Sequence, residues 1–143
     1  MTQINADAHI RLARPVRDLA AAERFYAGGL GLDVLYRGFA DGPGEHDIVM
    51  VGLTGAAWHL ELVCVPGPGV PDVSEHDLLV IYLDGSVPDS WGERIVAAGG
   101  SRVSAGPYWD RWGVTFADPD GHRVVLSTRN WANTPEVARP PKV

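Results

Sequence analysis

Cysteine is almost missing from this sequence of 143 residues, in which Cys64 stands alone. A single cysteine excludes an internal disulfide and is typical of proteins from a reducing compartment. No run of about 18 apolar residues occurs, so no transmembrane helix is expected. Residues 1–7 have neither a basic flank nor an apolar core, and so do not resemble a signal peptide. We therefore expect a cytoplasmic protein.

Basic residues are also scarce, with 12 Lys and Arg against 18 Asp and Glu and a formal net charge of −6. Proteins that bind nucleic acids or membrane surfaces gather Lys and Arg into patches, and none is visible here. Phosphate-binding loops, dinucleotide fingerprints and nucleophile elbows are missing as well. Nucleic acids and membranes are therefore not expected as partners, whereas a small molecule is.

The elements that can be predicted follow one order twice. Alternating and apolar runs predict strands, apolar residues at helical spacing predict helices, and Gly-Gly pairs end the helices. In the first half the expected elements are a strand at 9–13, a helix at 19–26 with Asp18 as its N-cap, and strands at 33–37, 48–53 and 58–65. In the second half they are a strand at 78–83, a helix at 91–98, and strands at 101–105, 113–117 and 122–128. The repeat predicts two βαβββ modules.

The remaining segments delimit these modules within one domain, 1–143. Proline and glycine fill the stretch from Val65 to Pro71, which can form neither helix nor strand interior. We assign 8–65 to the first module, 66–76 to a linker, 77–128 to the second module and 129–143 to an extended tail. The predicted fold is α+β: an open, U-shaped sheet of eight strands around a cleft, with the helices outside.

Two stretches resemble the vicinal-oxygen-chelate superfamily, which contains glyoxalase, bleomycin resistance proteins and dioxygenases. The first runs from His9-Ile10-Arg11-Leu12 through Asp18-Leu19 and Phe25-Tyr26 to Gly29-Leu30-Gly31-Leu32. The second is the closing hairpin from Phe116 through Asp118-Pro119-Asp120-Gly121 to Leu126. The resemblance covers most of the chain and implies the same fold, a cavity, and in many members a divalent metal.

In the metal-dependent members, the ligands come from the first and last strand of each half. The first half supplies His9 and Glu61, but the positions that we match to them in the second half are Leu78 and Val125. Two protein donors are too few for a stable site, unless His59 or His76 completes the set. No metal or other cofactor is therefore favoured, and a divalent metal at His9 and Glu61 remains the alternative.

Further residues are expected on the cleft face because strand side chains alternate. Glu61 shares its face with His59, and Arg11 is positioned to pair with Glu61 or to bind an anionic ligand group. In the second half the same reasoning places Tyr82, Arg123 and Ser127 on this face. His9 and Glu61 could instead form a buried pair that only satisfies both partners.

Aromatic residues gather between two strands of the second half, at Tyr108, Trp109 and Trp112. Periodicity does not require large aromatic side chains in this predicted loop. They could stack on a flat ligand at the mouth of the cleft, close the end of the cleft, or pack on a second subunit.

These observations favour a protein that binds or sequesters a small, flat or apolar molecule, without a catalytic residue that can be named. The alternative is a metal-dependent lyase, isomerase or dioxygenase related to glyoxalase that uses His9 and Glu61. A scaffold whose cleft is filled by its own aromatic residues is a third possibility. An open sheet of this kind also predicts a homodimer, because C2 pairs are the commonest assembly.

Overall fold

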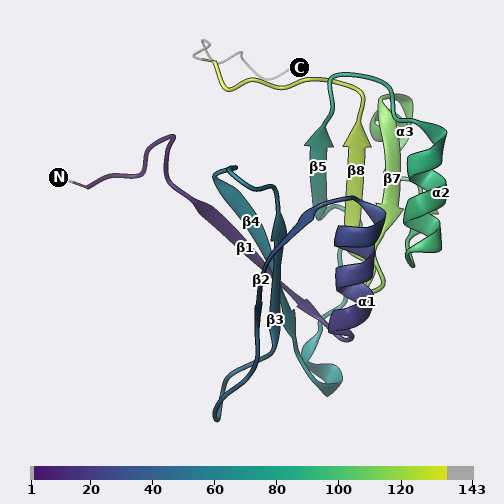
Figure 1. The fold of residues 1–143 in the computed structure, drawn as a ribbon. Coiled ribbons are helices and arrows are strands. Elements are labelled where there is room, and N and C mark those ends of the chain that lie inside the picture. The colour runs from purple at the N-terminus through teal and green to yellow at the C-terminus, as the bar shows by residue number, and fades with distance from the viewer. Residues whose placement is uncertain (1, 135–143) are drawn as a thin grey trace, which may run out of the picture.

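The computed structural model describes residues 2–134 and contains two modules of the same design (Figure 1). The elements of the first module are β1 (Ile10–Val16), α1 (Leu19–Glu23), the π-helix η1 (Arg24–Gly29), β2 (Asp33–Gly38), β3 (Ile48–Gly52) and β4 (Trp58–Cys64). After the 3-10 turn η2 (Gly67–Gly69), the second module contains β5 (Leu78–Tyr82), α2 (Asp89–Ala97), β6 (Ser101–Val103), α3 (Pro107–Arg111), β7 (Gly113–Ala117) and β8 (Arg123–Ser127).

Each module forms one mixed sheet of four strands, in the order β1-β4-β3-β2 (sheet A) and β5-β8-β7-β6 (sheet B). The first and last strands of a module are parallel, and the other neighbours are antiparallel. The α+β class and the two βαβββ modules are thus confirmed. Within the described residues the eight strands form two separate sheets, since no hydrogen-bonded pairing joins β1 to β5.

The first helix begins as predicted, because the Asp18 side chain accepts a hydrogen bond from Ala21 N at 3.0 Å. It then widens into η1 and ends three residues later than expected. Gly29 does not act as a left-handed cap. A Cβ there would lie 3.3 Å from Ile95 Cα and 3.2 Å from Ala98 Cβ, so glycine allows the helices of the two modules to approach closely. The left-handed position is Gly31, with φ 79°.

The stretch predicted to be a loop, Tyr108 to Trp112, is largely the short helix α3. Pro107 occupies its first turn, where a missing N–H costs nothing, and Gly106 before it has φ 100°. Five residues are too few for an apolar stripe, so periodicity could not have revealed this helix. Of the predicted tail, 129–143, residues 129–134 form no helix or strand, and 135–143 lie outside the described residues.

Both sheets share one hydrophobic core. Buried side chains of sheet A (Leu60, Leu62) and of sheet B (Val124, Leu126) belong to the same cluster as Phe25 of η1. The helices of both modules pack against each other in this core rather than covering a common eight-stranded sheet from outside. Since strand side chains alternate, the opposite face of each sheet turns away from the core. We call these the outer faces of sheets A and B.

A buried polar chain connects the modules. Arg14 Nη1 of β1 donates to Tyr26 Oη at 3.1 Å, and Tyr26 Oη donates to Asp118 Oδ2 at 2.7 Å. The exposed fractions of Arg14, Tyr26 and Asp118 are 4%, 0% and 5%. The Asp118 carboxylate also accepts hydrogen bonds from the backbone N–H groups of Asp120 and His122. The same carboxylate therefore stabilises the predicted turn and, through Tyr26, contacts the first module. None of the helices within residues 2–134 is long and apolar enough to cross a membrane.

Tyr26→Phe should therefore destabilise the protein, because it leaves a buried arginine and a buried carboxylate without their shared partner. We expect a loss of about 1–3 kcal/mol in the free energy of unfolding, measured by denaturant titration. Tyr108→Phe is the matched control, since this side chain is 53% exposed and should lose less than about 0.5 kcal/mol. Equal losses in the two variants would contradict the structural role of the buried chain.

Candidate functional site

The outer face of sheet A carries polar side chains from its first and last strands. Arg11 of β1 pairs in register with His59 of β4, and Ala13 pairs with Glu61. A bulge between Val34 and Tyr36 lets consecutive residues of β2 reach this face, where the Leu35 side chain lies over Gly52. This apolar border was not predicted, because a bulge leaves no trace in simple alternation.

The two predicted histidines of the first module contact each other. His9 Nε2 and His59 Nδ1 are 2.7 Å apart and the ring centroids 4.9 Å apart, so one ring donates a hydrogen bond to the other. The second nitrogen of His59, Nε2, is buried and has no partner within the described residues. A ligand or water that reached this atom would find an unused hydrogen-bonding position.

Glu61 forms an ion pair with Arg11. Arg11 Nη1 donates to Glu61 Oε1 at 3.2 Å, and the exposed fractions of the two side chains are 53% and 13%. The partly exposed guanidinium retains free donors on the outer face of sheet A. Of the two roles that the sequence left open for Arg11, the structure contains the pairing with Glu61.

The outer face of sheet B carries the other predicted residues. Tyr82 at the end of β5 is 41% exposed and lies in register with Ser127 of β8. Ser127 is fully buried and donates to Trp112 O at 3.3 Å, while Arg123 Nη1 donates to Ser104 O at 3.4 Å. These two side chains therefore support the segment around α3.

The aromatic residues of this segment divide into two groups. Tyr108 and Trp109 pack edge to face, with centroids 5.0 Å apart and an interplanar angle of 85°. Trp112 lies under two guanidinium groups, those of Arg111 at 5.0 Å and Arg129 at 4.6 Å. Two cations thus already contact the Trp112 ring, whereas Trp109 contacts the edge-to-face ring of Tyr108.

The structure thus brings the predicted residues together in two groups rather than one. His9, Arg11, His59 and Glu61 meet on sheet A, and Tyr82, Arg123 and Ser127 lie with the aromatic segment on sheet B. Because both outer faces turn away from the shared core, they do not face each other within the chain.

The strand registers also correct one match between the modules. Arg11 pairs with His59, two residues before Glu61, and Leu78 pairs with Arg123, two residues before Val125. If Glu61 and Val125 are equivalent, the counterpart of Leu78 is Arg11, and not His9 as proposed from the sequence. A guanidinium thus stands at the position of β1 that corresponds to Leu78, two residues after His9, which the sequence analysis named as the metal ligand.

The donors present do not fit a divalent metal. Glu61 is paired with a cation, and the two histidines are bonded to each other instead of converging with it. Within residues 2–134, no three His, Cys, Asp or Glu side chains gather into a group that could hold a metal ion. A site of this class needs three or four such donors.

Comparison with known proteins agrees with this architecture. Residues 10–63 match the YycE-like N-terminal domain and residues 76–128 the YycE-like C-terminal domain. The uncharacterized protein YycE of Bacillus subtilis is 39% identical over 122 residues, which cover 83% of this chain and 86% of that protein. A crystal structure of YycE from Bacillus subtilis, of unknown function and named after glyoxalase and fosfomycin resistance proteins, has a TM-score of 0.76 and 35% identity, covering 89% of this chain and 93% of that chain.

A more distant neighbour is TnmS3, an antibiotic binding protein from Streptomyces sp. CB03234. Its TM-score is 0.56 and its identity 28%, over 87% of this chain and 98% of that chain. The fold and its neighbours make this protein a member of the vicinal-oxygen-chelate superfamily. Within that superfamily the chain belongs to the YycE-like family.

Proposed function

We propose that this protein binds a small, flat or apolar molecule without covalent chemistry, in a cleft between the outer faces of sheets A and B. The observation that carries the proposal is the Arg11–Glu61 ion pair, in which a guanidinium pairs with the carboxylate that the sequence analysis named as a metal ligand. The antibiotic-binding activity named for TnmS3 is consistent with such a role in this superfamily.

The cleft walls suit an aromatic ligand with a polar group. Exposed apolar surface is available at Leu35, Tyr36 and Tyr82, whose exposed fractions are 39%, 56% and 41%. Arg11 supplies a cation beside this surface, and His59 Nε2, which lacks a partner among residues 2–134, supplies a further hydrogen bond. Apolar walls with a few polar groups are typical of small-molecule sites.

Binding is tested by calorimetric titration of two planar probes of opposite charge, anthraquinone-2-sulfonate and acridine orange. We expect saturable binding of at least one probe. Trp109→Ala should weaken it by about 1 kcal/mol or more, which is roughly fivefold, because a stacking surface is lost. Trp131→Ala is the control, since this ring is 68% exposed and its Nε1 donates to Asn133 Oδ1. The proposal fails if neither probe binds, or if both variants bind like the wild type.

We further propose that the cleft is completed by a second copy of the chain. Among residues 2–134, β1 and β5 each end their sheet, so each has one edge that no other described strand pairs with. Ile10 N bonds Ala57 O on the β4 side, which turns the backbone groups of Arg11 and Ala13 toward that open edge. Open strand edges with apolar side chains favour pairing with another chain. Pairing β1 with β5 of a second copy would place the two outer faces around one cleft.

Exposed side chains beside the β1 edge allow a test of this homodimer. Ile10 and Leu12 are 66% and 48% exposed, which is unusual for a strand next to the core. By light scattering at micromolar concentration, the wild type should have twice the mass of the chain, and Ile10→Lys with Leu12→Lys should be a monomer. Ile4→Lys, at a residue 96% exposed, should remain a dimer. A monomeric wild type would refute the paired cleft.

A further inference from the structure

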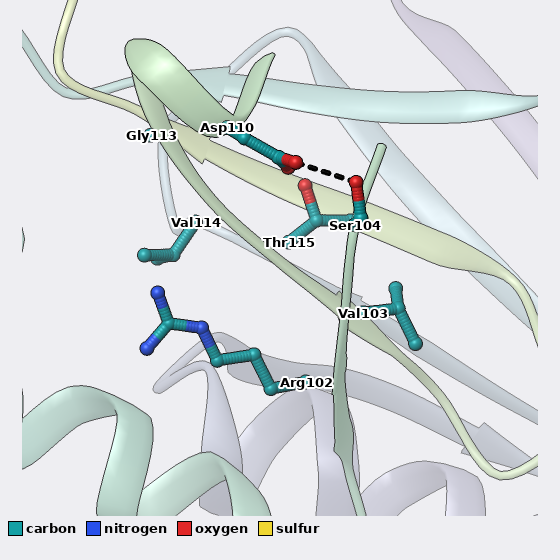
Figure 2. Close-up of a pocket in the computed structure, with 7 residues that line it drawn as sticks. All are labelled: Arg102, Val103, Ser104, Asp110, Gly113, Val114 and Thr115. Carbon is teal, nitrogen blue, oxygen red and sulfur yellow. Dashed lines mark hydrogen bonds between the residues drawn. The ribbon is translucent and has the colours of Figure 1, made fainter. Parts of the chain in front are cut away.

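A polar pocket of about 380 Å³ opens where β6 ends, at the edge of sheet B farthest from β5. The ladder between β6 and β7 covers only three pairs and stops at Val103 and Thr115. Beyond this point the chain leaves the sheet toward α3, while β7 extends to Gly113 without a partner from β6. The pocket fills the resulting gap (Figure 2).

One side of the pocket is an anchored carboxylate. Asp110 of α3 accepts hydrogen bonds from Ser104 Oγ at 2.5 Å and from Ala105 N at 3.1 Å. These two bonds, with a smaller contribution from the Arg102 guanidinium, lower the pKa of Asp110, so the group is ionised at neutral pH. Each carboxylate oxygen keeps a free lone pair for a further donor.

Thr115 supplies a second polar group, a buried hydroxyl that packing alone does not require. Its residue is only 2% exposed, and its hydroxyl has no hydrogen-bond partner among the described residues. A buried hydroxyl without a partner costs about 1–3 kcal/mol. The side chain lines the pocket beside Asp110, so a polar group bound there would remove this cost.

Arg102 brings the opposite charge. Figure 2 shows its guanidinium and the Asp110 carboxylate at opposite ends of the lining residues, with Val114 and Thr115 between them. Within residues 2–134 no carboxylate forms an ion pair with Arg102. The pocket therefore contains one cation and one anion that do not neutralise each other by contact.

We propose that this pocket binds a free α-amino acid or a similar small zwitterion with an apolar side chain. The ammonium group of the ligand donates to Asp110 and to the Thr115 hydroxyl, and its carboxylate accepts from Arg102. Val103, which lies in register with Thr115 on the same face, supplies apolar surface for the side chain of the ligand. A simple cation would leave Arg102 repelling it, and a simple anion would meet Asp110, so only a ligand with both charges satisfies both ends.

This site goes beyond the proposed cleft and uses none of the residues assigned to it. The pocket is formed entirely by the second module, at the opposite edge of sheet B from Tyr82. It should therefore be present in a monomer, and should bind whether or not planar probes bind near Trp109. The two proposals can therefore fail independently, and the experiments show which of them has failed.

The test is an NMR titration of the ¹⁵N-labelled full chain with three probes that share one isobutyl group: L-leucine, 3-methylbutylamine, which lacks the carboxylate, and 4-methylpentanoate, which lacks the ammonium group. L-leucine should shift the amide signals of Ala105, Gly106 and Gly113 and bind at least tenfold more tightly than the amine or the acid. Asp110→Asn and Arg102→Gln should each weaken binding of L-leucine at least tenfold. Thr115→Val, which replaces only the hydroxyl, should weaken it severalfold.

Asp41→Asn and Arg24→Gln are the matched controls, at exposed residues away from the pocket, and should bind L-leucine like the wild type. Dispersed spectra establish that each variant is folded, and Arg102 is exposed enough that its replacement leaves the core intact. Equal binding of all three probes, no shift of the pocket amides, or unchanged binding in Arg102→Gln would overturn the proposal.

Discussion

The arrangement of this protein depends on the buried chain from Arg14 through Tyr26 to Asp118. A charged arginine and a carboxylate that are almost completely buried must each find partners, because an unpaired buried charge costs several kcal/mol. Burial and the neighbouring Asp118 carboxylate raise the pKa of Tyr26, so its hydroxyl keeps its proton and donates to Asp118 over the physiological range. The three residues come from β1, η1 and the turn before β8, and so fix one module against the other.

Fixing the modules in this way determines where ligands can bind. The helix-bearing faces meet in one core, and the faces that carry polar residues turn outward. Within residues 2–134, β1 and β5 are two of the four strands that end a sheet, together with β2 and β6. The proposed dimer, the proposed cleft and the exposure of Ile10 and Leu12 are consequences of this one constraint.

Much of the fold could be predicted from the sequence, because strands and helices produce local patterns of apolar and polar residues. Alternating and apolar runs located all eight strands, and Asp18 marked the first helix correctly. The relation between the modules could not be predicted, since it depends on Arg14, whose burial contradicts the usual exposure of arginine. The short helix α3 and the bulge before Tyr36 are equally invisible, because each departs from its period over only a few residues.

For the candidate site, the sequence predicted which residues share a face better than it predicted how the strands are arranged relative to one another. His59 and Glu61 lie on one face as alternation requires, and Arg11 meets Glu61. The matches of His9 with Leu78 and of Glu61 with Val125 differ by two residues and cannot both hold, because strand register depends on pairing that a single sequence does not display. The direct contact between His9 and His59 follows from the same pairing, since the parallel partner of Arg11 is His59.

The claim that Arg11 takes the place of a metal beside Glu61 is tested most directly by metal analysis of freshly purified protein. If the ion pair with Glu61 replaces a metal, zinc, nickel, iron and manganese should each be far below one ion per chain, in the wild type and in Glu61→Ala alike. Added zinc or manganese should raise the melting temperature little, because ligand stabilisation is small when the Kd is near the metal concentration. One tightly bound metal ion per chain that is lost in Glu61→Ala would contradict the account.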